Sequence, residues 1–165
     1  MTRRSLLVAV LMSVGLVQAP KRTVWDGVFS EEQAARGQAQ YTRSCASCHA
    51  ADLRGSSTAP SLVEESFAFQ WGDTSVGELF DRIRVLMPSD RPNSLSPQTY
   101  RDIVAFILQS NQFPTGAKDL DADVESLKQI AITAKGRSQI EQAKLAGYHH
   151  HHRAQAEDAD RVESG

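Results

Sequence analysis

The chain has 165 residues, of which 41% are hydrophobic and 23% are charged, so it can bury one small core. Its formal net charge is -2 at pH 7. Because that charge offers no basic surplus for the phosphates of DNA or RNA, we exclude a nucleic-acid ligand and expect a small globular protein.

The first 19 residues have the layout of a secretory signal. Two arginines at positions 3 and 4 precede an apolar stretch from Leu6 to Val17, and the small residue Ala19 offers a cleavage site. The stretch is shorter than the roughly 20 residues that cross a bilayer comfortably, so we expect no stable membrane span, with an uncleaved anchor as the alternative. We predict a signal peptide over 1–19 and a periplasmic location.

A first helix is predicted from about Glu31 to Arg43. Ser30 followed three residues later by Gln33 is a capping-box pattern. Gly37 and Tyr41 lie four residues apart and therefore share one face of this helix. Since glycine has no side chain, we expect another helix to approach closely at that point.

The segment Cys45-Ala46-Ser47-Cys48-His49 directly follows this helix. Its spacing, C-x-x-C-H, is the attachment signature of haem c, in which two thiols bond to the porphyrin and the adjacent histidine reaches the iron. The main alternative is a plain disulfide between Cys45 and Cys48. A thioredoxin-like site would need a βαβ setting, and a zinc site would need four ligands. We predict one covalent haem c on Cys45 and Cys48, with His49 as an axial ligand.

Residues 50–70 show little periodicity, so we predict a loop that wraps around the proximal side of the haem. Within it, Phe67 and Phe69 are expected to form an apolar wall. Trp71 is a further candidate haem contact, because its indole N–H can reach a propionate while its rings pack on the macrocycle. Simple packing is the alternative for Trp71.

A second helix is predicted after Ser75, which forms another capping box with Glu78. It leads to Met87, and the two other methionines are the initiator and a residue of the leader. Pro88 disfavours helix at the residue before it, so Met87 should lie where the helix gives way to an extended loop. We predict that Met87 is the second axial ligand of the iron, with the filling of a core gap as the alternative.

A third helix should begin at Ser96 and Pro97, since serine caps helices well and proline suits the first helical position. Its apolar residues fall on one face, which we expect to pack across the first helix near Gly37. Residues 114–134 are predicted as a C-terminal extension with a short amphipathic helix within 119–132 that folds back on the domain. Residues 135–165 are predicted as a polar, disordered tail, and its run His149–His152 is given no function.

Together, Cys45–His49, Ala59-Pro60, Trp71 and Met87-Pro88 resemble the motifs of a class I mono-haem cytochrome c. The resemblance covers a domain of residues 25–113 and is greatest to small bacterial cytochrome c domains associated with quinoprotein dehydrogenases. It implies an all-α cytochrome c fold, in which the N- and C-terminal helices cross and loops wrap around one covalently bound haem. It also implies that the Pro60 carbonyl accepts a hydrogen bond from the free ring nitrogen of His49.

With His49 and Met87 both on the iron, no position is left for a substrate, so we expect a one-electron carrier and not an enzyme. The resemblance implies a periplasmic dehydrogenase as donor and an oxidase or another cytochrome as acceptor. Residues 27–113 contain no lysine, so a docking surface must use arginines or apolar contacts. Two alternatives are a haem-based gas sensor or small haem enzyme with a labile Met87, and a tightly bound cytochrome subunit of a dehydrogenase complex.

Overall fold

The computed structural model describes residues 22–133. Helices dominate this part of the chain, as expected for an all-α cytochrome c fold, and the two strands have two residues each. The elements in chain order are β1 (Arg22–Thr23), the 3-10 turn η1 (Val24–Asp26), α1 (Glu31–Ser44), α2 (Ala46–His49), α3 (Glu64–Trp71), α4 (Val76–Leu86), α5 (Pro97–Ser110), α6 (Val124–Lys128) and β2 (Ile130–Ala131). The predicted signal peptide (1–19) and polar tail (135–165) lie outside the described residues.

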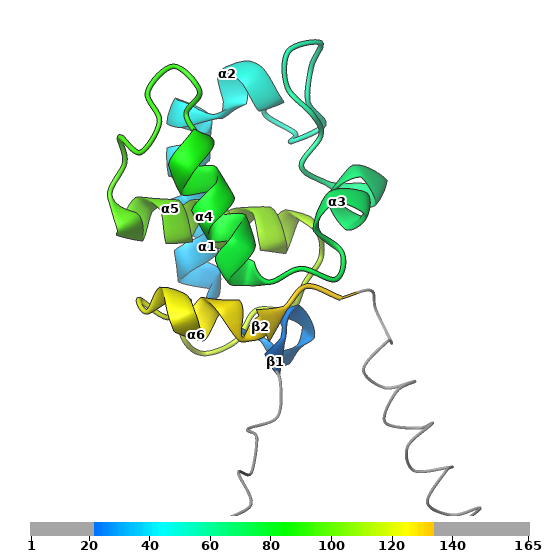
Figure 1. Ribbon diagram of the computed structural model, residues 1–165, viewed down its shortest axis with the longest axis vertical. Helices are drawn as coiled ribbons and strands as arrows, with labels where there is room; N and C mark the ends of the chain where they lie inside the picture. Colours follow the sequence, from blue (N-terminus) through cyan, green and yellow to red (C-terminus); the bar gives the residue numbers. More distant parts are fainter. Residues whose placement is uncertain (1–21, 134–165) are drawn as a thin grey trace, which may run out of the picture.

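The centre of the molecule is the crossing of α1 and α5, which run in clearly different directions in Figure 1. At the crossing, a Cβ added to Gly37 would lie 1.8 Å from the carbonyl oxygen of Asp102, so only glycine allows this approach. One turn further along α1, the ring of Tyr41 packs on that of Phe106 with centroids 5.3 Å apart. The predicted helix crossing near Gly37 is confirmed.

Two predicted capping boxes have different outcomes. At α4 both halves form, because the Glu78 amide donates to Ser75 Oγ at 3.2 Å and the Ser75 amide donates to Glu78 Oε2 at 2.8 Å. At α1 the Gln33 amide donates to Ser30 Oγ at 3.0 Å, but Gln33 Oε1 instead accepts from the Leu120 amide at 2.7 Å. The Gln33 side chain is fully buried under the C-terminal extension, and this tertiary contact replaces the local one.

The prediction of a loop over 50–70 was wrong at its end, where Glu64–Trp71 forms α3. Residue Val63 caps this helix without a side-chain hydrogen bond, so the sequence lacks the usual start signal. The apolar wall was also only half right, since Phe67 is buried but Phe69 is 95% exposed. Two residues apart, the two rings point to different sides of a helix.

The C-terminal extension has a shorter helix than the one predicted within 119–132. Asp123 caps α6 by accepting from the amides of Glu125 and Ser126, and the helix covers only Val124–Lys128. Ile130–Ala131 then leaves the helix to form β2, which pairs in parallel with β1. The helix does not continue through Ile130 because these residues instead pair with β1, near the start of the described residues.

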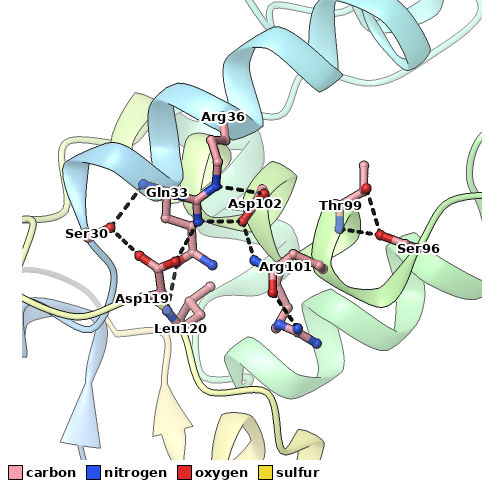
Figure 2. Close-up of polar contacts among 10 residues, drawn as sticks. Ser30, Gln33, Arg36, Ser96, Thr99, Arg101, Asp102, Asp119 and Leu120 are labelled. Carbon is pink, nitrogen blue, oxygen red and sulfur yellow. Dashed lines mark hydrogen bonds and ion pairs between the residues drawn. The ribbon is translucent and has the colours of Figure 1, made fainter.

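A polar network joins the extension to both crossing helices (Figure 2). Arg36 of α1 binds Asp102 of α5 at 3.2 Å and Asp119 of the extension at 2.5 Å. The Ser30 hydroxyl also donates to Asp119. The hydrogen bond from Ser30, followed by the bond from Arg36, lowers the pKa of the Asp119 carboxyl.

The two ends of the described chain meet each other and residues 73–74 in what we call the terminal clasp, formed by residues 22–25, 73–74 and 130–133. Beyond the strand pairing, Trp25 Nε1 donates to the Thr133 carbonyl at 2.9 Å, and Ile132 exchanges backbone hydrogen bonds with Asp73 and Thr74 at 2.9 and 2.8 Å. In Figure 1 the clasp lies at the opposite end of the molecule from α2. Within residues 22–133, no helix has the length and apolar character needed to cross a membrane.

Candidate haem site

The C-x-x-C-H segment forms a single helical turn. Cys45 is the C-cap of α1 and the N-cap of α2, and its carbonyl accepts hydrogen bonds from the amides of Cys48 and His49 at 3.1 and 3.0 Å. This turn brings the three side chains to adjacent positions. Cys45 is half-buried, Cys48 is exposed, and both are free thiols, so the alternative disulfide is not formed. Burial, followed by the proximity of Cys48, raises the pKa of the Cys45 thiol to about 11.

His49 is held in one orientation by the loop that follows it. Its side chain is buried, and its Nδ1 lies 2.9 Å from the carbonyl oxygen of Pro60, the contact that the family resemblance implied. Because a carbonyl oxygen only accepts, Nδ1 carries the proton and the lone pair of the neutral ring is on Nε2. No residue in the described range hydrogen-bonds to Nε2, which leaves this nitrogen as the donor atom for a metal.

Several hydrogen bonds shape the loop between His49 and Pro60. The amide of Gly55 donates to the His49 carbonyl at 2.9 Å, and the Tyr41 hydroxyl donates to the Ala50 carbonyl at 2.8 Å. Gly55 has a φ of 80°, and a Cβ there would lie 2.6 Å from the Ala59 carbonyl oxygen. A glycine is therefore required for the turn that brings Pro60 back to the histidine.

Met87 lies at the point where α4 ends, as its position before Pro88 predicted. Its backbone is extended, with φ -123° and ψ 152°, and its amide donates to the Ile83 carbonyl at 2.8 Å. Its own carbonyl accepts from the Tyr100 hydroxyl at 2.7 Å. In Figure 1 the end of α4 and the loop after it lie toward the same end of the molecule as α2. Ligation of iron by Met87 stays a prediction.

Trp71 is the last residue of α3, is half-buried and packs against the core. Its indole nitrogen makes no hydrogen bond to any residue between 22 and 133, so a propionate contact also stays a prediction. Of the two arginines on α4, Arg82 is exposed, whereas Arg84 lies 5.9 Å above the Phe80 ring and 3.5 Å from Asp81. The Nε atom of Arg84 is buried and has no hydrogen-bond partner among the described residues.

The side chains at this end of the molecule fit haem c. They supply two unpaired thiols three residues apart, an imidazole whose Nε2 has no protein partner, and a thioether at a helix end. These would hold the porphyrin by Cys45 and Cys48 and its iron by His49 and Met87; when bound, the group supplies an iron that alternates between the ferrous and ferric states. The part of the chain that the structure describes has no cluster of three or more His, Cys, Asp or Glu side chains suited to a metal ion, so a zinc site has no support there.

Three supporting residues were not recognised from the sequence. Asn111, at the end of α5, accepts from the Glu64 amide at 3.0 Å and donates to the Leu62 carbonyl at 2.9 Å, which fixes the start of α3. The hydroxyls of Tyr41 and Tyr100 bind the backbone next to His49 and at Met87. An asparagine after a helix is a recognisable cap, but neither its partner nor those of the tyrosines can be read from local sequence.

Comparison with known proteins agrees with this geometry. Residues 32–107 match the family model described as cytochrome C oxidase, cbb3-type, subunit III, a segment that contains α2, α3, α4 and Met87. The helical fold and this match define a c-type cytochrome domain. Residues 32–107 thus belong to a class I cytochrome c domain, whose cofactor is haem c and whose activity is haem-based electron transfer.

No curated protein matches the chain significantly. Among solved structures, the chain is similar to the sulfane dehydrogenase SoxCD from Paracoccus pantotrophus, with 22% sequence identity and a TM-score of 0.44. The match covers 73% of this chain and 68% of that one.

Proposed function

We propose that the protein is a periplasmic one-electron carrier and not an enzyme, with haem c attached to Cys45 and Cys48 and its iron ligated by His49 and Met87. The observation that carries the proposal is the buried imidazole of His49, which directly follows Cys48 and is fixed by Pro60 through Nδ1 at 2.9 Å. A thioredoxin-like or disulfide-bonded pair of cysteines has no need for such an orienting contact on the neighbouring histidine.

Each residue has a separate task in this proposal. The Pro60 carbonyl accepts a hydrogen bond from Nδ1–H, which fixes the imidazole and raises the basicity of Nε2. Met87 completes the coordination and, as a thioether, favours the ferrous state and so raises the reduction potential. Because both axial positions are taken by protein, an electron is gained or lost without a vacant position for a substrate.

The proposed donor is a periplasmic dehydrogenase, and the proposed acceptor is an oxidase or another cytochrome. The sequence resemblance to cytochrome domains associated with quinoprotein dehydrogenases supports this pairing. Within residues 22–133, the exposed large apolar side chains are Phe69, Val85 and Leu86, the last two directly before Met87. With no lysine in residues 27–113, they favour a small, apolar and transient docking contact. The periplasmic location follows from the predicted leader.

The test is the visible spectrum of the protein matured in a bacterial periplasm, recorded oxidised and reduced, with and without carbon monoxide. We expect a covalent haem c spectrum with the weak red band of sulfur ligation, unchanged by the gas. Rapid binding of carbon monoxide would favour the sensor or small-enzyme alternative. Covalent haem absent from the purified protein would overturn the proposal, and stable co-purification with a dehydrogenase would indicate a bound subunit.

A further inference from the structure

Tyr100 lies at the start of α5 with its side chain 1% exposed, and its hydroxyl contacts both ends of the loop that carries Met87. It donates to the Met87 carbonyl at 2.7 Å and accepts from the Leu95 amide at 3.3 Å. Among residues 22–133, no other side chain hydrogen-bonds to the backbone of Met87 or Leu95. One hydroxyl therefore closes a nine-residue loop across its two ends.

The Met87 carbonyl needs this partner because of its place in the chain. Helix α4 has ended at this residue, so no later amide of a continuing helix reaches the Met87 carbonyl. The backbone hydrogen bonds of the loop run from the Met87 amide to the Ile83 carbonyl at 2.8 Å and from the Asn93 amide to the Arg84 carbonyl at 3.0 Å. A third bond joins the Arg91 amide to the Pro88 carbonyl at 2.9 Å, and none of the three reaches α5. The Tyr100 hydroxyl is thus the contact that sets the position of Met87 relative to the α1–α5 crossing.

The same crossing provides a second buried tyrosine on the other side of the site. Tyr41 is also 1% exposed and donates to the Ala50 carbonyl, one residue after His49, at 2.8 Å. His49 has additional restraints, since Pro60 fixes its ring and the two neighbouring cysteines carry the covalent bonds of haem c. Met87 has no neighbouring covalent attachment, so its position depends more strongly on its tyrosine.

We propose that Tyr100 is a positioning residue for the Met87 thioether. By holding the Met87 carbonyl and the Leu95 amide together, its hydroxyl keeps the loop in the conformation that presents the sulfur to the iron. The inference rests on the proposed ligation by Met87 and adds the residue that controls how easily this ligand leaves.

The test compares Tyr100→Phe with Tyr41→Phe as a matched control. Each variant removes one buried hydroxyl that donates to a backbone carbonyl, so each loses a similar hydrogen bond of the fold. We expect Tyr100→Phe to weaken the red sulfur band of the ferric protein, lower its reduction potential and raise the rate of carbon monoxide binding to the ferrous protein about tenfold. Tyr41→Phe should change these three quantities much less, because His49 keeps the hydrogen bond from its ring to Pro60 and the covalent attachment of the neighbouring cysteines.

The outcomes separate this inference from the proposed function. If the wild-type protein lacks the sulfur band and binds carbon monoxide at once, ligation by Met87 fails before any variant is considered. If the wild type has the band, but Tyr100→Phe matches either the wild type or Tyr41→Phe in all three readouts, the role of Tyr100 alone is overturned.

A second measurement keeps the inference testable if Tyr100→Phe does not mature. Imidazole is added to the ferric wild-type protein to displace Met87, and hydrogen exchange is followed at the Leu95 amide. We expect faster exchange at Leu95 on displacement, because this amide shares the Tyr100 hydroxyl with Met87. Unchanged protection at Leu95 would show that the hydroxyl is not coupled to the ligand.

Discussion

The haem end of the molecule and the terminal clasp are held together by different kinds of contact. At the haem end, His49 and the carbonyl that orients it are 11 residues apart, and Met87 and Tyr100 are 13 apart. In the clasp, the indole of Trp25 binds a carbonyl 108 residues further along the chain. The chemistry of the protein therefore depends on short segments, whereas the closure of its fold depends on segments from opposite ends of the chain.

The α1–α5 crossing connects the two ends. Two of its residues, Tyr41 and Tyr100, contact the backbone of the haem end, and two others, Arg36 and Asp102, belong to the network that holds the extension. Changes at the haem end should alter the spectrum and the reduction potential. Changes in the polar network that holds the extension should alter only the free energy of unfolding. Changes in the helix packing at the crossing should alter the spectrum and the reduction potential as well as the free energy of unfolding.

The largest effect is expected from Cys45→Ala combined with Cys48→Ala. Without the two thiols, no thioether bond can form, so covalent haem should be lost completely. The measurement is a haem stain of the protein after denaturing electrophoresis. Ser47→Ala, an exposed change between the two cysteines, should keep the stain. Covalent haem in the double variant would contradict the assignment of the site.

The next largest effect is expected at the crossing, from Gly37→Ala. The added Cβ would lie 1.8 Å from the Asp102 carbonyl oxygen and 2.9 Å from the Cβ of Phe106, so the helices must separate. We expect a loss of about 3 kcal/mol in the free energy of unfolding, measured with denaturant, or a failure to mature. Ala39→Leu adds volume to the exposed face of α1 and should have little effect. Equal unfolding midpoints for the two variants would contradict the close packing of α1 and α5.

A smaller effect is expected from Gln33→Ala, which removes the acceptor of the Leu120 amide. Gln33 is fully buried, and its loss leaves that amide without its partner, so we expect a decrease of about 1–3 kcal/mol in the free energy of unfolding. The reduction potential should not change. Gln38→Ala, on the exposed face of α1, provides the matched control. A shifted potential in Gln33→Ala would show that the two ends of the molecule are coupled.

The smallest effect concerns Asp119 and pH. Since the hydrogen bonds from Ser30 and Arg36 lower the pKa of this carboxyl in the folded protein, its stabilising contribution is complete above its unfolded pKa of about 3.9. The contribution is lost as the pH falls through the lower, folded pKa. Because the side chain is 43% exposed, we expect less than about 1 kcal/mol.

The check is the unfolding midpoint of the wild type and of Asp119→Asn between pH 2 and pH 6. The difference between the two proteins should be largest near pH 6 and should shrink toward pH 2. A difference that does not change with pH would rule out the ionised carboxylate as the source of the stabilisation.

Much of the haem end could be predicted because its signals are local. The spacing of Cys45, Cys48 and His49 places their side chains together in one turn, and Pro88 by its own geometry ends the helix before it at Met87. The capping box of Ser75 and Glu78 formed as predicted for the same reason, since its partners are three residues apart.

The errors have the opposite cause. Helix α3 was missed because Asn111, 47 residues away, supplies the acceptor for its first amide, and no local cap marks its start. The wrong prediction for Phe69 has the same cause. In an extended loop, residues two apart point to the same side, whereas in α3 they point to different sides, and the Phe69 ring is exposed. Gln33 left the predicted capping box because Leu120, 87 residues further on, offered a buried amide.

The amino-acid sequence by itself determined the cofactor motif, the boundaries of α1 and α4, the start of α5 and the glycine where α1 crosses α5, because each depends on residues within a few positions or on a single side-chain property. Only the tertiary structure decided the start of α3, the pairing of β1 with β2 and the partner of the Tyr100 hydroxyl. These depend on groups that are distant along the chain, and a buried hydrogen-bonding group takes whichever partner the packed helices bring within reach.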